Sequence, residues 1–238
     1  MRLNDKVAII TGAASGIGKD IAIAFAREGA KVAIADLNQK PADATAREID
    51  PGGKRAIGVA MDVTDEQQVE AGTAKVVEAF GALDILVSNA GIQIVAPIVD
   101  FGCCCRSSRR CLSHGAGSVA PDVQAAKREH HLRGLGALEG SLRAQGTLRY
   151  AKHGLVGLAK VVAKEGAAHG ARANVIFPGF VRTPLVEKQI PEQAKELGIS
   201  EQEVIKNVML KETVDGEFTR WMTWLRPRSS WPPLGRTR

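Results

Sequence analysis

The chain has 238 residues, of which 45% are hydrophobic, 24% charged and 4% aromatic. This composition is typical of a globular protein with a sizeable core, and it excludes a disordered or fibrous chain. No apolar run approaches the roughly 18 residues that cross a bilayer. The first residues lead directly into Val7–Ile10 without a cleavage signal, so we expect a cytoplasmic protein.

The formal net charge of +6 is concentrated in two segments. Residues 102–149 carry +5, residues 220–238 carry +5, and the other 171 residues carry −4. The first segment contains all four cysteines without the paired spacing of a zinc site: Cys103, Cys104, Cys105 and Cys111. Its arginines follow no helical stripe and have no interleaved aromatic residues. We therefore expect no metal ion, no nucleic-acid partner and no membrane partner.

From residue 7 onward, short apolar runs alternate with amphipathic stretches, which is typical of an α/β fold with a parallel sheet. The apolar runs predict strands at residues 7–10, 31–35, 57–60, 85–87 and 174–177. The amphipathic stretches predict helices at residues 17–28, 41–49, 66–79 and 153–168. Residues 102–149 show no sustained period of 2 or 3.6 residues, so we expect the central segment to be poorly ordered.

A glycine-rich turn, Thr11-Gly-Ala-Ala-Ser-Gly-Ile-Gly18, joins the first predicted strand to the first predicted helix. Gly12 permits a tight turn, Gly16 lets the backbone approach a pyrophosphate, and Gly18 lets the helix pack on the strand. The N-terminus of the helix supplies unpaired N–H groups and partial positive charge. The pattern predicts a dinucleotide-binding site.

Asp36 ends the second predicted strand, 18 residues after Gly18. A carboxylate at this place can accept hydrogen bonds from the adenosine ribose, and it would repel a 2′-phosphate. The residue therefore predicts NAD as the cofactor rather than NADP. The alternative interpretation is a surface aspartate that caps the following segment.

The spacing of this turn, the pair Asp62-Val63 and the turn Asn89-Ala90-Gly91 together resemble the short-chain dehydrogenase/reductase family. The resemblance continues at Lys152–Leu155 and Pro178–Thr183. It implies a Rossmann-type, doubly wound parallel sheet in three αβα layers, with the whole chain as one domain. It also implies a homotetramer, although the Pro- and Arg-rich tail in place of a final strand leads us to expect monomers or aggregates.

The resemblance also assigns residues to the cofactor. In this family the Asp-Val pair contacts the adenine, and the Asn-Ala-Gly turn lies beside the cofactor. The implied cofactor-binding residues are Gly12, Ser15, Gly16, Ile17, Gly18, Asp36, Asp62, Val63, Asn89, Ala90, Gly91, Lys152, Pro178, Gly179, Val181 and Thr183.

Two segments, residues 91–97 and 183–192, resemble the bacterial D-3-hydroxybutyrate dehydrogenases within this family. In those enzymes glutamines from both segments hold the carboxylate of the substrate. The resemblance therefore assigns this role to Gln93 and Gln189. An amide can donate a hydrogen bond to a carboxylate without adding a charge.

The residues that exchange the substrate proton depart from the family pattern. The family uses Tyr-x-x-x-Lys, which places a phenol and an ammonium on one helix face, and a serine 13 residues before the tyrosine. Lys152 matches the lysine, but Leu148 and Leu135 occupy the places of the tyrosine and the serine. Tyr150 is two residues from Lys152, about 200° around a helix, and is a doubtful catalytic candidate.

A shifted reading frame can account for this departure. With suitable codons for residues 130–149, reading one base later yields an apolar strand, a serine that overlaps Leu135 and a tyrosine that overlaps Leu148. Both then have the family's spacing. A different shift after Thr219 yields an acidic helix start. We interpret the sequence as frame-disrupted over about residues 102–150 and again after residue 219.

The resemblance implies an NAD-dependent oxidoreductase that interconverts D-3-hydroxybutyrate and acetoacetate by hydride transfer, with catalysis impaired in this chain. The alternative is a non-catalytic NAD-binding remnant of such an enzyme. A third hypothesis, a basic nucleic-acid or membrane-surface module, is supported by net charge alone.

Overall fold

The computed structural model describes residues 2–91, 129–133, 146–211, 213 and 215–219. The chain divides into two compact units, Met1–Gly179 and Phe180–Arg238, which we describe separately. Among the described residues, no helix is both long and apolar enough to cross a membrane.

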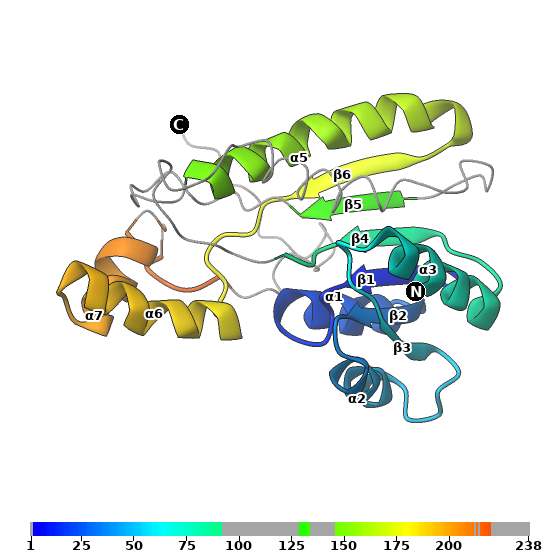
Figure 1. Ribbon diagram of the computed structural model, residues 1–238, viewed down its shortest axis with the longest axis horizontal. Helices are drawn as coiled ribbons and strands as arrows, with labels where there is room; N and C mark the ends of the chain where they lie inside the picture. The colour runs from blue at the N-terminus through cyan, green and yellow to red at the C-terminus, as the bar shows by residue number, and fades with distance from the viewer. Residues whose placement is uncertain (1, 92–128, 134–145, 212, 214, 220–238) are drawn as a thin grey trace, which may run out of the picture. The chain divides into compact units, whose positions relative to one another are not determined.

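A parallel six-stranded sheet forms the first unit, with its strands in the order β3-β2-β1-β4-β5-β6 (Figure 1). The strands are β1 Val7–Thr11, β2 Lys31–Asp36, β3 Ala56–Ala60, β4 Ile85–Ser88, β5 Glu129–Arg133 and β6 Arg172–Ile176. The helices are α1 Gly16–Arg27, α2 Gln39–Ile49, α3 Glu66–Phe80 and α5 Gly146–Glu165, followed by the 3₁₀ turn η2 Gly166–His169. The order reverses at β1, because β2 lies on one side of it and β4 on the other.

Both faces of the sheet are covered around β1 and β2. Successive strand residues point to opposite faces. One face packs with α1 and α2 in a buried cluster that includes Ala8, Ile10, Val32, Ile34, Ala22 and Ala42. The other face packs with α3 in a cluster that includes Val7, Ile9, Ala33, Ala35 and Val76. Burial on both faces explains why the strands are apolar along Val7–Ile10 and Val32–Ala35, and it confirms the three-layer α/β architecture.

The predicted elements of this unit are confirmed with small shifts at their ends. The helix expected at residues 41–49 begins at Gln39, and the strand expected at 174–177 is Arg172–Ile176. The helix expected at 153–168 begins earlier, at Gly146, and ends at Glu165. Its first turns contain Leu148 and Tyr150, so these two positions and Lys152 belong to one helix.

The expectation that the central segment, residues 102–149, is poorly ordered is wrong for one part of it. Glu129–Arg133 forms β5, which pairs in parallel with β4 on one side and β6 on the other. The physical reason is that ladder hydrogen bonds use backbone groups, which every residue except proline supplies in full. The rest of the central segment, residues 102–128 and 134–145, lies outside the described residues, as do the four cysteines and the tail after Thr219. The oligomeric state therefore stays a prediction.

The second unit contains α6 Pro184–Leu197, the short α7 Glu201–Glu203 and the π-helical turn η3 Val204–Met209. Ile190, Val204 and Met209 form its buried core. α6 was not predicted from the sequence, although Thr183 at its N-cap and proline at its first position are a recognisable helix start. Hydrogen bonds from Ser200 to the Glu203 carboxylate lower the pKa of Glu203.

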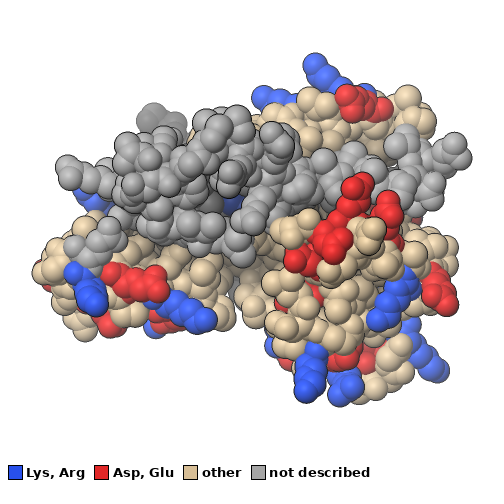
Figure 2. Space-filling view, viewed as in Figure 1, with Lys and Arg blue, Asp and Glu red and all other residues tan. Residues whose placement is uncertain are grey.

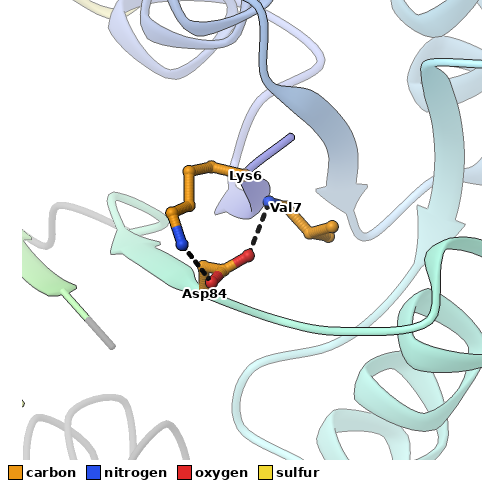
Figure 3. Close-up of polar contacts among 3 residues, drawn as sticks. All are labelled: Lys6, Val7 and Asp84. Carbon is orange, nitrogen blue, oxygen red and sulfur yellow. Dashed lines mark hydrogen bonds and ion pairs between the residues drawn. The ribbon is translucent and has the colours of Figure 1, made fainter. Parts of the chain in front are cut away.

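Asp84 joins the starts of β1 and β4 (Figure 3). Its carboxylate accepts the Val7 N–H at 3.0 Å and the Lys6 ammonium at 2.9 Å, while its own N–H donates to the Val7 carbonyl at 2.9 Å. Val7 is buried, so its N–H has this carboxylate in place of water. One residue thus continues the ladder between β1 and β4 beyond the regular strand pairs.

We expect Asp84→Ala to lower the free energy of unfolding by about 1–3 kcal/mol, because it leaves a buried N–H without its acceptor. The matched change Lys6→Met removes only a half-exposed ion pair and is expected to cost less than about 1 kcal/mol. Urea unfolding of the two variants measures the difference. Equal losses would show that the Val7 N–H bond contributes little.

Candidate functional site

The glycine-rich turn lies between β1 and α1, as the sequence predicts, and two kinds of constraint require its glycines. Gly12 and Gly16 have φ of +63° and +55°, a backbone region that residues with a Cβ atom rarely adopt. A Cβ atom at Gly18 would lie 2.4 Å from the Gly12 carbonyl oxygen and 2.5 Å from the Asn89 amide nitrogen. Gly18 therefore allows α1 to pack directly against the turn and against the end of β4.

Thr11 and Asn89 connect the ends of β1 and β4. The Asn89 side-chain amide donates to the carbonyls of Thr11 at 2.8 Å and of Gly12 at 3.2 Å. In return, the buried Thr11 hydroxyl accepts the N–H groups of Asn89 and Ala90, each at 3.0 Å. Thr11 was not among the predicted site residues. It holds the Asn-Ala-Gly turn beside the glycine-rich turn, at the point where the strand order reverses, and open α/β sheets bind ligands at this point.

The N-terminus of α1 directly follows the glycine-rich turn. Ser15 is its exposed N-cap residue, but the Ser15 side chain makes no capping hydrogen bond. Ile17 in the first turn is half-buried. Lys19 is paired with Glu48 of α2 at 2.7 Å, so its ammonium is directed toward α2. The first N–H groups of this helix are thus suited to bind an anion such as a pyrophosphate.

The two acidic residues expected to face the adenosine follow neighbouring strands. Asp36 ends β2, and its Oδ2 accepts the Ala14 N–H of the glycine-rich turn at 3.1 Å. Asp62 follows β3, and its Oδ1 accepts the N–H and the hydroxyl of Thr64, both at 2.8 Å. Val63 beside it is half-buried. Because Asp36 is in register with Ala60, these residues lie at the same edge of the sheet as the turn.

Lys152 reaches this edge from α5. Its side chain is half-buried, and its Nζ lies 3.9 Å from the point where a Cβ of Gly91 would be. Lys152 therefore approaches the Asn-Ala-Gly turn. Leu148 is four residues before it in the same helix, and Tyr150 only two. Residues four apart share one face of a helix, whereas residues two apart do not.

The remaining predicted site residues are distributed between the two units. Pro178 is buried and Gly179 half-buried, and both follow β6 in the first unit. In the second unit Val181 is buried, Gln189 is half-buried in α6, and the Thr183 hydroxyl caps α6 by accepting the Val186 N–H at 3.3 Å. Gln93 lies outside the described residues. No cluster of three metal-ligating side chains occurs in the part of the chain that the structure describes.

Residues 12–218 match a family model described as enoyl-(acyl carrier protein) reductase. The chain belongs to the short-chain dehydrogenase/reductase family. The match spans the glycine-rich turn, both acidic residues, Lys152 and α6. It therefore confirms the predicted family and an oxidoreductase fold that generally uses NAD or NADP.

The relatives in this family are named for different substrates. The D-beta-hydroxybutyrate dehydrogenase of Rhizobium meliloti is 36% identical over 216 residues, which cover 87% of this chain and 83% of that protein. The 3-oxoacyl-[acyl-carrier-protein] reductase FabG of Thermotoga maritima is 34% identical over 207 residues, 84% of this chain and 83% of that protein. The crystal structure of sorbitol-6-phosphate 2-dehydrogenase SrlD from Erwinia amylovora superposes with a TM-score of 0.81 at 27% identity, covering 92% and 89% of the two chains.

We expect Gly18→Ala to lower the free energy of unfolding by about 1–3 kcal/mol, because the added methyl group must displace backbone at Gly12. Gly157→Ala is a matched control in α5, where the added methyl group meets nothing within 4 Å. That change should raise stability by about 0.4–1 kcal/mol. Thermal unfolding of both variants tests the close approach, and a neutral Gly18→Ala would contradict it.

Proposed function

We propose that this short-chain dehydrogenase/reductase binds NAD in preference to NADP. The proposal is supported by Asp36, whose carboxylate is bonded through Oδ2 to the glycine-rich turn and is half-buried beside it. A 2′-phosphate placed on this side of the adenosine would meet that negative charge. When bound, the cofactor supplies the hydride acceptor, and the chain's own residues orient it.

The proposed substrate is D-3-hydroxybutyrate, oxidised to acetoacetate. Two relatives, from Rhizobium meliloti and Cupriavidus necator, are named D-beta-hydroxybutyrate dehydrogenases, at 36% and 34% identity. Support also comes from the glutamines at positions 93 and 189, which suit a carboxylate. Relatives named for sorbitol and threitol make a polyol the competing substrate class.

We further propose that turnover is impaired in the chain as it stands. The observation that carries this proposal is that Lys152 approaches Gly91 while leucine, not tyrosine, stands four residues before it. An ammonium on this face can hold a hydroxyl or lower the pKa of a phenol four residues before it, and position 148 carries leucine in place of that phenol. A non-catalytic NAD-binding remnant is the second candidate function, and the same leucine favours it.

A basic nucleic-acid module remains the least supported alternative. Lys and Arg side chains occur together with Asp and Glu on the face drawn in Figure 2. The tail after residue 219 and most of the Arg-rich central segment lie outside the described residues. Net charge is therefore still the only support for this alternative.

Calorimetric titration of the purified chain with NAD and NADP tests the cofactor. We expect NAD to bind at least about tenfold more tightly and Asp36→Ala to narrow that ratio, because the variant removes the charge that opposes a 2′-phosphate. Glu70→Gln, which removes a charge from an exposed position on α3, should leave the ratio unchanged. Equal affinities in the unsubstituted chain would refute the assignment of Asp36.

Turnover of D-3-hydroxybutyrate should be at or near background, because general acid-base catalysis alone supplies about 10²–10⁴ in rate. Leu148→Tyr with Leu135→Ser should restore little, since about 1 Å of misplacement can cost 100-fold. A gene with the reading frame restored across residues 102–150 and after 219 should recover NAD-dependent oxidation. Robust turnover of the unrepaired chain that Tyr150→Phe abolishes would instead identify Tyr150 as the acid-base residue.

A further inference from the structure

A buried threonine of α2 is bonded to the glycine-rich turn. Thr45 is only 2% exposed, and its hydroxyl donates to the Ala14 carbonyl at 3.2 Å. The two residues are 31 positions apart in the chain, and this bond ties α2 to the loop between β1 and α1. Thr45 belongs to none of the sequence motifs described above.

Both backbone polar groups of Ala14 form hydrogen bonds. Its N–H donates to Asp36 Oδ2 at 3.1 Å, and its carbonyl accepts the Thr45 hydroxyl. The two bonds act on consecutive peptide planes, so together they restrict both backbone dihedrals of Ala14. The preceding N–H, of Ala13, is bonded to the Ala35 carbonyl at 3.2 Å. The outer side of the turn is thus fixed to β2 and α2.

Helix α2 is hydrogen-bonded to and packed against the edge strand β3, and these contacts define the position of the Thr45 hydroxyl. The Gln39 side-chain amide accepts the Ala60 N–H at 2.9 Å and donates to the Gly58 carbonyl at 3.0 Å. A Cβ at Gly58 would lie 2.3 Å from the Asp43 carboxylate, so the helix crosses β3 in direct contact with its backbone. These contacts with β3 restrain α2, which in turn supports the glycine-rich turn through Thr45.

We propose that Thr45 is a positioning residue that sets the discrimination between NAD and NADP. The inference rests on the proposed function, in which Asp36 faces the adenosine ribose. The Thr45 hydroxyl restrains the Ala14 carbonyl, and the Ala14 N–H donates to one carboxylate oxygen of Asp36. The other oxygen of Asp36 is then available to the ribose of the cofactor. Without the Thr45 hydroxyl, the Asp36 carboxylate can turn with Ala14 away from a 2′-phosphate, and the repulsion weakens.

Nucleotide binding to a graded series of variants tests this inference. Thr45→Val keeps the shape but removes the donor, and we expect it to narrow the NAD-to-NADP affinity ratio about 3- to 10-fold, the effect of one hydrogen bond. Thr45→Ser keeps the hydroxyl and should restore the original ratio. Thr45→Cys carries a weaker donor and should give an intermediate ratio. A purely structural role would lower the melting temperature without changing the ratio.

Thr73→Val is the matched control, because it removes a partly buried hydroxyl that donates to the Val69 carbonyl within the same helix, α3. A change in the ratio for Thr73→Val equal to that for Thr45→Val would overturn the inference. So would an unchanged ratio in Thr45→Val or, if circular dichroism shows that variant unfolded, in Thr45→Cys. These outcomes leave the proposed NAD site intact. If the unsubstituted chain binds no NAD, the proposed function fails, and the inference fails with it.

Discussion

The hydrogen bonds of Thr11 and Asn89 join the carboxyl ends of β1 and β4, and the candidate site depends on this junction. Strand order reverses between these two strands, and open α/β sheets bind ligands at such a point. The Asn89 amide spans two carbonyls of the glycine-rich turn, and the Thr11 hydroxyl binds two N–H groups of the Asn-Ala-Gly turn. Because Thr11 is buried, these bonds are shielded from competing water.

The glycine-rich turn and helix α5 require different things of the sequence. The glycine-rich turn needs backbone freedom and close approach, which Gly12, Gly16 and Gly18 supply. The proposed catalysis needs a tyrosine at one position of α5, and position 148 holds leucine there. β5 completes the sheet between β4 and β6, since the ladder requires only backbone groups. A segment whose side chains depart from the family pattern can therefore still supply a strand of the family's sheet.

The acidic residues at the edge of the sheet have both a structural and a proposed binding role. Asp36 accepts a hydrogen bond from the glycine-rich turn through one oxygen, and Asp62 accepts hydrogen bonds from the N–H and the hydroxyl of Thr64. Such bonds orient the carboxylates before any ligand arrives, which lowers the entropy cost of binding. Helix α2 adds hydrogen bonds to those of the acidic residues. Gln39 accepts the Ala60 N–H at the end of β3, and Thr45 donates to the carbonyl of Ala14 in the glycine-rich turn.

The sequence alone determined the family, the parallel α/β order and the glycine-rich turn, because each depends on local pattern: apolar runs, helical periodicity and glycine spacing. It also indicated Asp36 and Lys152 through their spacing within motifs. Only the tertiary structure showed that Thr11 and Thr45 hydrogen-bond to the turns of the candidate site. It also showed that Lys152 approaches Gly91 and that β5 lies in the sheet. These features depend on residues far apart in the chain, such as Thr11 and Asn89, 78 positions apart, or on backbone pairing that any residues can supply. Local pattern carries no signal for such contacts, because neither partner has its role until the strands and helices pack.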